Sequence, residues 1–311
     1  MNKILILCRR DDRTEYDQRA SMLAAMKDVD SKVEYYSADF EDLLFTYDGE
    51  KLCITDTVSG TDIVDYDALF LIGWFKSKIL EDVARAVVRY AHAHGIPFTN
   101  SEAYHGRSFS KLSQLVVAVL QGVRTTRFVF SMDSTILRKA IDDASFGSQY
   151  ILKAVVASRG NDNYLVTDSS QLSVIDEERD MPAYFVAQDF IPNDGDYRVL
   201  VMGGKVRRVI HRLANEGTHL NNTSKGGTAN LLPIDSLPLS VLEDSINLAR
   251  IFRREVTGID MMMHRQTGEY YFLEANNMPQ LATGSYVNEK MTSLDEFLSE
   301  LADGTAVRYM D

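Results

Sequence analysis

The stretch "GIDMMMHRQTGEYYFLEANNMP" (residues 258–279) has the pattern of a β-hairpin whose returning strand ends in polar residues. Its turn lies near Gly268, and the second apolar run closes on an acid and an amide, Glu274 and Asn276. Residues two apart on a strand point to the same face, so these two side chains project together. Pairing of the strands about Gly268 places Asp260 opposite Asn276. The hairpin therefore predicts three oxygen-bearing side chains on one face.

These three side chains suit a hard cation. An aspartate, a glutamate and an asparagine, with no histidine or cysteine beside them, favour Mg²⁺ or Mn²⁺ over zinc. Magnesium in proteins typically shares its oxygen ligands with the phosphates of a nucleotide. The alternative is a set of strand-end polar residues on a solvated face, because short patterns often arise without function. The hairpin alone leaves both interpretations open.

Composition and charge limit the classes of protein to consider. A chain of 311 residues with 45% hydrophobic residues has room for one large domain or two to three smaller ones. A net charge of −12 argues against broad binding to nucleic acid or to anionic membranes. The apolar runs are too short to span a bilayer, and the N-terminus lacks a signal-peptide cleavage pattern. Cys8 and Cys53 have no metal-ligand spacing, so we expect a reducing, cytoplasmic location.

The first third of the chain predicts a parallel βαβ unit. Apolar runs at residues 3–8 and 68–74 have the length of buried strands. Between them and the strand-like run at 96–100, residues 80–94 carry apolar side chains at helical spacing. Strand, helix and strand in this order indicate a small doubly wound α/β domain that ends near residue 100.

After residue 100, the predicted pattern of helices and strands changes twice. Helical spacing near residues 111–121 and a strand at 150–156 precede a run of strands that starts near 183. Two hairpins follow, one of them turning at Gly203-Gly204, with a long helix at 239–256 between them. A Ser293–Glu296 capping box predicts the start of the last helix. The predicted domains are 1–100, 101–185 and 186–311.

Several charged residues stand inside apolar strands. Lys153 lies within "YILKAVV" and needs an anionic partner unless it reaches solvent from an edge strand. The following loop, "ASRGND", could cover phosphates with backbone N–H groups, although its single glycine supports this only weakly. Asp196 and Arg198 share one strand face, and Arg212 on the partner strand could join Arg198 at a phosphate. A surface ladder of charge fits the same pattern.

The order of these parts resembles the ATP-grasp superfamily, most closely the RimK-type glutamate ligases and the bacterial glutathione synthetases. The resemblance covers residues 101–290 and rests on a consistent series of motifs: Lys111, Lys153, "SRG", "AQDFI", "DGDYRVLVMGGKV", Arg212, "NNTSKGG", "GID" and "LEANNMP". It implies an ATP-grasp fold, α/β with an α+β C-terminal part. The N-terminal βαβ unit is similar in placement to the family's Rossmann-like pre-ATP-grasp domain.

By position, the resemblance implies three sets of site residues. The nucleotide-binding set is Lys111, Lys153, Ser158, Gly160, Gln188, Asp189, Ile191 and Asp196. The catalytic set is Arg198, Arg212 and the substrate-side Asn222, and the metal set is Asp260, Glu274 and Asn276. Three features depart from the family pattern: a glycine-poor phosphate loop, Asp189 where glutamate is frequent, and Gln280 where glycine commonly follows the proline.

The resemblance implies an enzyme that uses ATP with Mg²⁺ or Mn²⁺ to join a carboxylate to an amine through an acylphosphate. The substrates are an amino acid or peptide carboxylate and an amine acceptor. A phosphotransferase or a non-catalytic nucleotide-binding protein is the alternative, and the presence of Arg212, Asp260 and Glu274 favours the ligase. The two substrates and the oligomeric state are left open, although similar enzymes are commonly homo-oligomers.

A basic cluster follows the first predicted strand, where open α/β sheets tend to bind ligands. Arg9, Arg10 and Arg13 could anchor a substrate carboxylate there. A solvated charged turn, with Asp11 and Asp12 as partners, explains the same cluster and is favoured over the anchor.

Overall fold

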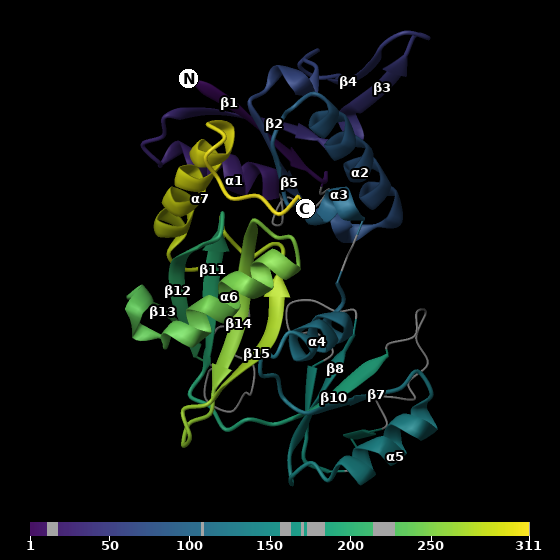
Figure 1. The fold of residues 1–311 in the computed structure, drawn as a ribbon, viewed down its shortest axis with the longest axis vertical. Helices are drawn as coiled ribbons and strands as arrows, with labels where there is room; N and C mark the ends of the chain where they lie inside the picture. Colours follow the sequence, from purple (N-terminus) through teal and green to yellow (C-terminus); the bar gives the residue numbers. More distant parts are fainter. Residues whose placement is uncertain are drawn as a thin grey trace.

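The computed structural model of the protein describes residues 1–10, 18–106, 109–155, 163–168, 171–172, 184–213 and 228–310. Its strands form two four-stranded sheets, one five-stranded sheet and a separate two-stranded hairpin (Figure 1). Among these described residues, no helix combines the length and the apolar character that crossing a bilayer requires.

The N-terminal part is a parallel sheet with helices on both faces. Its strands lie in the order β2 (Val33–Asp39), β1 (Asn2–Cys8), β5 (Ala68–Ile72) and β6 (Phe98–Thr99). Alternate residues of β1 enter different cores, because a strand turns successive side chains to opposite faces. Ile4 and Ile6 pack with α1 (Gln18–Lys27), whereas Leu5 and Leu7 pack with α2 (Lys78–Ala93). The predicted strand–helix–strand order is therefore present.

The last helix, α7 (Val287–Ala302), covers the same face of this sheet as α1. The predicted capping box is wrong, since α7 begins six residues before Ser293. The Ser293 hydroxyl instead donates to the carbonyl of Glu289 at 3.1 Å, inside the helix. Lys290 and Met291 are buried in the first turns, so tertiary packing rather than a local cap decides where the helix starts.

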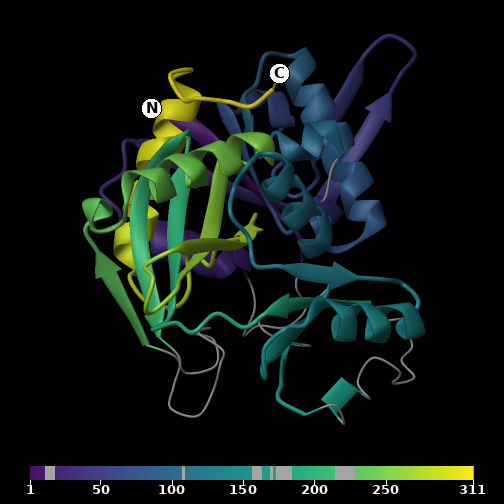
Figure 2. The same cartoon turned by 60° about the horizontal axis from the view of Figure 1, so that its bottom comes forward.

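A hairpin of β3 (Leu43–Tyr47) and β4 (Leu52–Asp56) extends away from the parallel sheet, as Figures 1 and 2 both show. Most of β3 is exposed, including Leu44 and Tyr47. The chain then passes through the short α3 (Glu102–His105) into α4 (Lys111–Leu120).

The middle sheet is antiparallel, in the order β7 (Phe128–Phe130), β10 (Phe185–Asp189), β8 (Tyr150–Ala154) and β9 (Asn163–Val166). Leu137 and Ile141 of α5 (Ser134–Ala144) pack against it. Since β8 has a described neighbour on each side, Lys153 stands on an inner strand. An edge-strand location for this lysine is therefore excluded.

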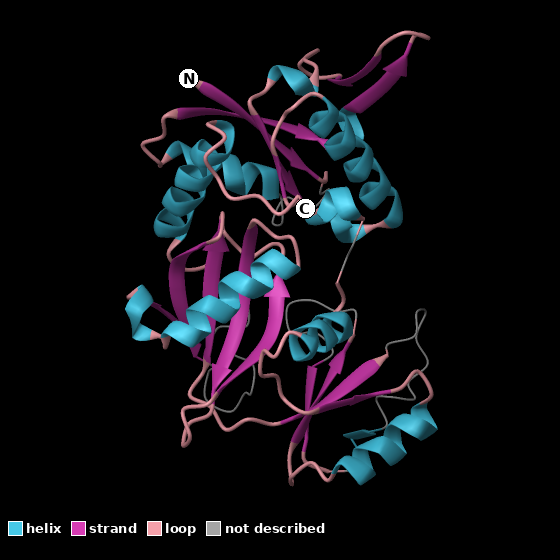
Figure 3. Ribbon diagram, viewed as in Figure 1, coloured by secondary structure: helices cyan, strands magenta, loops and turns pink. Residues whose placement is uncertain are grey.

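The C-terminal sheet is also antiparallel. Its order is β13 (Thr228–Leu232), β12 (Lys205–Leu213), β11 (Asp196–Met202), β14 (Val256–Met263) and β15 (Tyr270–Asn276). α6 (Leu239–Ile251) lies across one face of it (Figure 3). The predicted helix at 239–256 is too long at its end, because Arg253 takes a left-handed φ of 56° and β14 starts at Val256.

Candidate functional site

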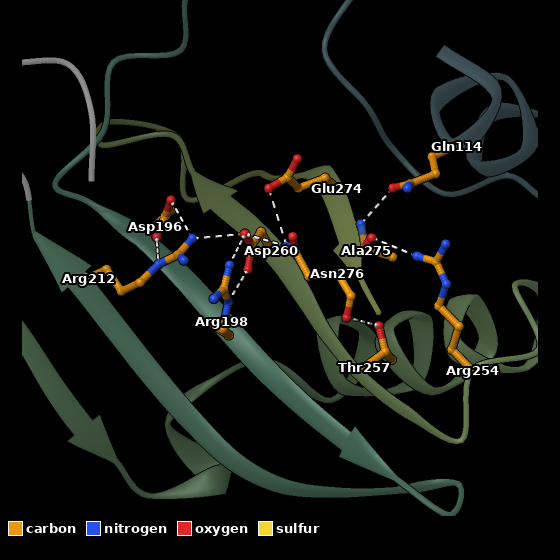
Figure 4. Close-up of polar contacts among 10 residues, drawn as sticks. All are labelled: Gln114, Asp196, Arg198, Arg212, Arg254, Thr257, Asp260, Glu274, Ala275 and Asn276. Atoms are coloured by element: carbon orange, nitrogen blue, oxygen red, sulfur yellow. Dashed lines mark hydrogen bonds and ion pairs between the residues drawn. The ribbon is translucent and has the colours of Figure 1, made fainter. Parts of the chain in front are cut away.

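Six of the predicted site residues lie side by side on the C-terminal sheet. Asp196 and Arg198 come from β11, Arg212 from β12, Asp260 from β14, and Glu274 and Asn276 from β15. The register of the sheet pairs Asp196 with Arg212, Arg198 with Asp260, and Asp260 with Glu274. Because residues two apart share a face, all six side chains gather in one row across the strands (Figure 4).

The predicted pairing within the hairpin is wrong. Asp260 lies opposite Glu274, and Asn276 lies opposite Gly258. The turn is centred before Gly268, and an irregularity between Asp260 and Met261 shifts the register by one residue. Asn276 nevertheless stays on the same face as the two acids. Its Nδ2 donates to Asp260 at 3.1 Å and to Glu274 at 3.2 Å.

Asp260 is the centre of a buried ion network. Arg198 donates to both of its oxygens, from Nε at 2.8 Å and from Nη2 at 2.7 Å. The Nη2 of Arg212 lies 2.9 Å from Asp260 Oδ2, and Arg212 also binds Asp196 through two bonds of 2.6 and 2.9 Å. All four side chains are more than nine-tenths buried. Each guanidinium is thus held by carboxylates before any ligand arrives.

Burial and charge act in opposite directions on the two aspartates. Burial by itself raises the pKa of the Asp260 carboxyl, but the charges of Arg198 and Arg212 outweigh it and hold that pKa below its usual value. Burial raises the pKa of Asp196, and the charge of Arg212 only partly offsets the rise. Asp260 is therefore the carboxylate that this environment keeps ionised.

The donor set fits a hard cation. The carboxylates of Asp260 and Glu274 both accept hydrogen bonds from the Nδ2 of Asn276. Their negative charges would stabilise a cation bound at this point. A reversed Asn276 amide would offer its oxygen at the same place, which gives three oxygen ligands of the kind Mg²⁺ prefers. Among the residues that the structure describes, no group of three or more His, Cys, Asp or Glu side chains forms a metal cage. The fit thus depends on the Asn276 oxygen.

Two lysines approach this site from the other side. Lys153 on β8 is half-buried, and burial is the main cause that lowers its pKa. The charge of Glu274 opposes this effect and that of Lys111 adds to it, so both groups lie within electrostatic reach. Lys111 Nζ donates to the Ala154 carbonyl at 3.4 Å, next to Lys153. Lys153 of the middle sheet and Lys111 of α4 thereby bring two cations to the carboxylates of the C-terminal sheet.

The predicted hinge connects the two sheets. Gln188 is buried at the end of β10 and donates from Nε2 to Thr126 Oγ1 at 2.7 Å. Asp189 accepts two bonds from Arg127, at 2.7 and 2.8 Å, and its N–H donates to the Arg127 carbonyl at 3.2 Å. Ile191 is buried. The side chains of Gln188 and Asp189 thus hold the hinge in place, and a contact of its backbone with adenine stays a prediction.

Three predicted residues, Ser158, Gly160 and Asn222, lie outside the described residues, and their roles stay predictions. The carboxylate anchor is not supported at Arg10. This side chain forms ion pairs with Asp39, at 3.3 Å, and with Asp42. These ion pairs account for the charge of Arg10, and Asp11, Asp12 and Arg13 lie outside the described residues.

A buried lysine on α7, which the sequence did not single out, lies close to the site. Lys290 is 3% exposed, and its Nζ donates to the carbonyls of Gln280, at 2.6 Å, and Thr283, at 2.7 Å. Gln280 adopts a left-handed φ of 55°, a backbone conformation that glycine adopts more readily than other residues. The lysine therefore holds the loop that follows β15. Its only sequence signal was a lysine within the apolar spacing of a helix.

Replacing Lys290 is expected to change how stability depends on pH. Burial, helped by the charge of Arg198, lowers the pKa of Lys290 from 10.5 to about 8. Between these values the unfolded chain binds more protons than the folded one, so the wild type gains stability as the pH rises. Lys290→Met lacks this gain. The difference in unfolding free energy, wild type minus variant, should grow between about pH 7.5 and pH 10 in urea titrations.

The control for this experiment is Lys78→Met, at an exposed position on α2. A wild-type-minus-variant difference for Lys290→Met that stays constant across the titration would show that the lysine keeps an ordinary pKa in the folded protein.

Because Gly258 has no side chain, Pro279 in the loop after β15 and the side chain of Arg198 can both pack against its backbone. A Cβ atom at this position would lie 2.7 Å from Pro279 Cβ and 3.2 Å from Arg198 Cδ. We expect Gly258→Ala to lower the free energy of unfolding by about 1–3 kcal/mol, because backbone or Arg198 must shift. Gly147→Ala is the matched control, since nothing lies within 4 Å of its Cβ. Equal stability of the two variants in urea titrations would contradict the close approach.

Comparisons with known proteins identify one family. A family model described as the RimK-like ATP-grasp domain matches residues 109–295, more than half of the chain. A protein of Cellvibrio japonicus named "Probable alpha-L-glutamate ligase" is 28% identical over 63% of this chain and 64% of its own. Its namesake in Sodalis glossinidius is 31% identical over 57% and 60%. The chain thus spans less than two thirds of the length of these relatives.

Solved structures show the same fold. The ATP-grasp ligase PsnB, complexed with a minimal precursor, Mg and ADP, superposes with a TM-score of 0.68 at 16% identity, over 96% of this chain and 97% of that one. D-alanyl-alanine synthetase A of Vibrio cholerae superposes with a TM-score of 0.66 at 17% identity, over 98% of each chain. The α/β ATP-grasp fold expected from the sequence is confirmed.

Proposed function

Because the chain belongs to the RimK-like ATP-grasp family, we propose that it is an ATP-dependent carboxylate–amine ligase that works through an acylphosphate. The observation that carries this proposal is the row of Arg212, Asp260, Glu274 and Asn276 on one sheet face, within electrostatic reach of Lys153 on β8 and near Lys111 on α4. Two anions must meet in such a reaction, and the site concentrates fixed positive charge where they would meet.

The residues of the chain divide this work. Lys111 and Lys153 bind the nucleotide phosphates, and Arg198 and Arg212 neutralise the phosphoryl group as the substrate carboxylate attacks it. A bound Mg²⁺ or Mn²⁺, held by Asp260, Glu274 and Asn276, would offset phosphate charge and fix the phosphate orientation. The amine then displaces phosphate and forms the amide.

The comparisons support a choice of substrate class. The curated relatives are named as glutamate ligases, and PsnB was solved with a peptide precursor. We therefore propose an amino acid or peptide as the carboxylate substrate and a small-molecule or peptide amine as the acceptor. We also propose a cytoplasmic location, where ATP is available.

The test is ADP release from Mg-ATP in pools of amino acids and peptides, with and without hydroxylamine. Hydroxylamine traps an acylphosphate as a hydroxamate, so pool-dependent ADP together with hydroxamate is the expected result. Glu274→Gln should abolish both, whereas Glu243→Gln, the same change at an exposed position on α6, should leave both unchanged. Phosphate transfer to a hydroxyl compound without hydroxamate would indicate a phosphotransferase. ATP binding without turnover in any pool would indicate a binding protein.

A further inference from the structure

β15 carries two of the three proposed metal ligands on the edge of its sheet. Among the described strands it pairs only with β14, so its outward N–H and C=O groups need partners from outside the sheet. Near its middle, the N–H of Phe272 donates to the carbonyl of Arg124 at 2.8 Å. The end that carries Glu274 and Asn276 lies beyond this contact.

At that end, side chains hold the backbone of Ala275, the residue between the two ligands. The N–H of Ala275 donates to Gln114 Oε1 at 2.7 Å, and its carbonyl accepts from Arg254 Nη1 at 2.7 Å. Figure 4 shows the two side chains reaching Ala275 from α4 and from the segment before β14. The next carbonyl, that of Asn276, accepts from Thr257 Oγ1 at 2.9 Å.

Both holding side chains are themselves fixed. Arg254 is 2% exposed and binds Glu102, which is fully buried on α3, through bonds of 2.9 and 2.6 Å. Gln114 is 5% exposed, and its Nε2 donates to the Phe109 carbonyl at 3.0 Å. A buried polar network whose hydrogen bonds are satisfied is rigid, so these two side chains can hold the backbone of Ala275 in one position.

Gln114 also ties the metal-ligand strand to the nucleotide side of the site. It lies three residues after Lys111 on α4, and residues at this spacing share one face of a helix. Lys111 in turn contacts the Ala154 carbonyl beside Lys153. One helix therefore touches both the strand of the metal ligands and the strand of the phosphate-binding lysine.

We propose that Gln114 and the Glu102–Arg254 pair are positioning residues: they hold Ala275 so that Glu274 and Asn276 stay aligned with Asp260. This inference rests on the proposed function. Without the bonds from Gln114 and Arg254 to Ala275, the end of β15 can move away from β14. Glu274 and Asn276 then lose their alignment with Asp260, while the nucleotide-binding lysines stay in place. The effect of losing the two bonds should consequently be specific to the metal-dependent part of nucleotide binding.

The experiment measures the Kd of ADP by calorimetry, once with excess Mg²⁺ and once with EDTA, for wild type and Gln114→Leu. The variant is expected to bind ADP about 10- to 100-fold more weakly in Mg²⁺, the range seen when partners of metal ligands are removed. In EDTA its Kd should stay within about twofold of the wild type. Gln121→Leu, the same change at an exposed position just after α4, is the matched control and should match the wild type.

The proposal is overturned if Gln114→Leu binds ADP like the wild type in Mg²⁺, or if it is weakened equally in EDTA. Should Gln114→Leu fail to fold, Arg254→Lys decides by the same criteria, because lysine keeps the charge beside Glu102 but cannot bond both Glu102 and Ala275. A wild type whose ADP binding ignores Mg²⁺ would count against the proposed function itself.

Discussion

Asp260→Asn is expected to lower nucleotide-dependent turnover at least about 100-fold. Loss of an outer partner of a metal ligand already costs about 10- to 100-fold, and Asp260 is itself a proposed ligand. The substitution keeps the shape of the side chain but removes the charge that two arginines share. Arg198 and Arg212, held 2.7 to 2.9 Å from the Asp260 oxygens, would then repel each other across an uncharged group. Steady-state ADP release from Mg-ATP with a stimulating substrate pool measures the loss.

The control is Asp194→Asn, which makes the same chemical change two residues before Asp196. Asp194 is 68% exposed and pairs with an exposed Arg265, so the substitution should change turnover by no more than about twofold. Circular dichroism and the melting temperature of Asp260→Asn show whether the fold survives. A folded Asp260→Asn that keeps more than a tenth of the wild-type rate would remove Asp260 from the proposed metal set.

Arg254→Met should produce the largest loss of stability, about 3–5 kcal/mol in the free energy of unfolding. Arg254 and Glu102 form a bidentate pair with almost no exposed surface, and removal of the cation leaves the carboxylate of Glu102 buried and uncompensated. The Ala275 carbonyl also loses its donor, which adds to the cost. Urea denaturation at neutral pH measures the change.

A double variant separates the charge effect from packing. Glu102→Met combined with Arg254→Met buries no unpaired charge, so it should be more stable than Arg254→Met alone. Arg265→Met, which removes an arginine from an exposed ion pair with Asp194, should cost less than about 1 kcal/mol. If the double variant were less stable than Arg254→Met, the buried pair would not be the source of the loss.

The residue types of the candidate site followed from the sequence, whereas the contacts between those residues did not. The alternation of a strand placed Glu274 and Asn276 on one face, and the structure agrees. The predicted cross-strand partner of Asp260 was wrong. The register of the two strands depends on the turn and on a local irregularity, and no residue type in the sequence indicates that irregularity. Arg198 and Arg212 were expected at a phosphate, yet they already hold aspartates in the protein.

Residues far apart along the chain were the least accessible to prediction. Glu102 and Arg254 are 152 residues apart, and nothing in either segment points to the other. The sequence singled out neither Gln114 nor Lys290. Their roles depend on which helix packs on which strand, and the sequence around each residue does not contain this information.

By itself, the sequence determined the elements of the protein and the residue types of the candidate site: a parallel βαβ unit, two hairpins, and the polar residues Asp260, Glu274 and Asn276 on one sheet face. These features depend on periodicity and turn residues, which act between near neighbours in the chain. Only the tertiary structure decided that Asp260 faces Glu274, that Lys153 stands on an inner strand, and that α7 packs on the N-terminal sheet. The physical reason is that apolar burial and buried ion pairs bring together segments that are far apart in the sequence. The local sequence of each segment does not specify which other segment it will contact.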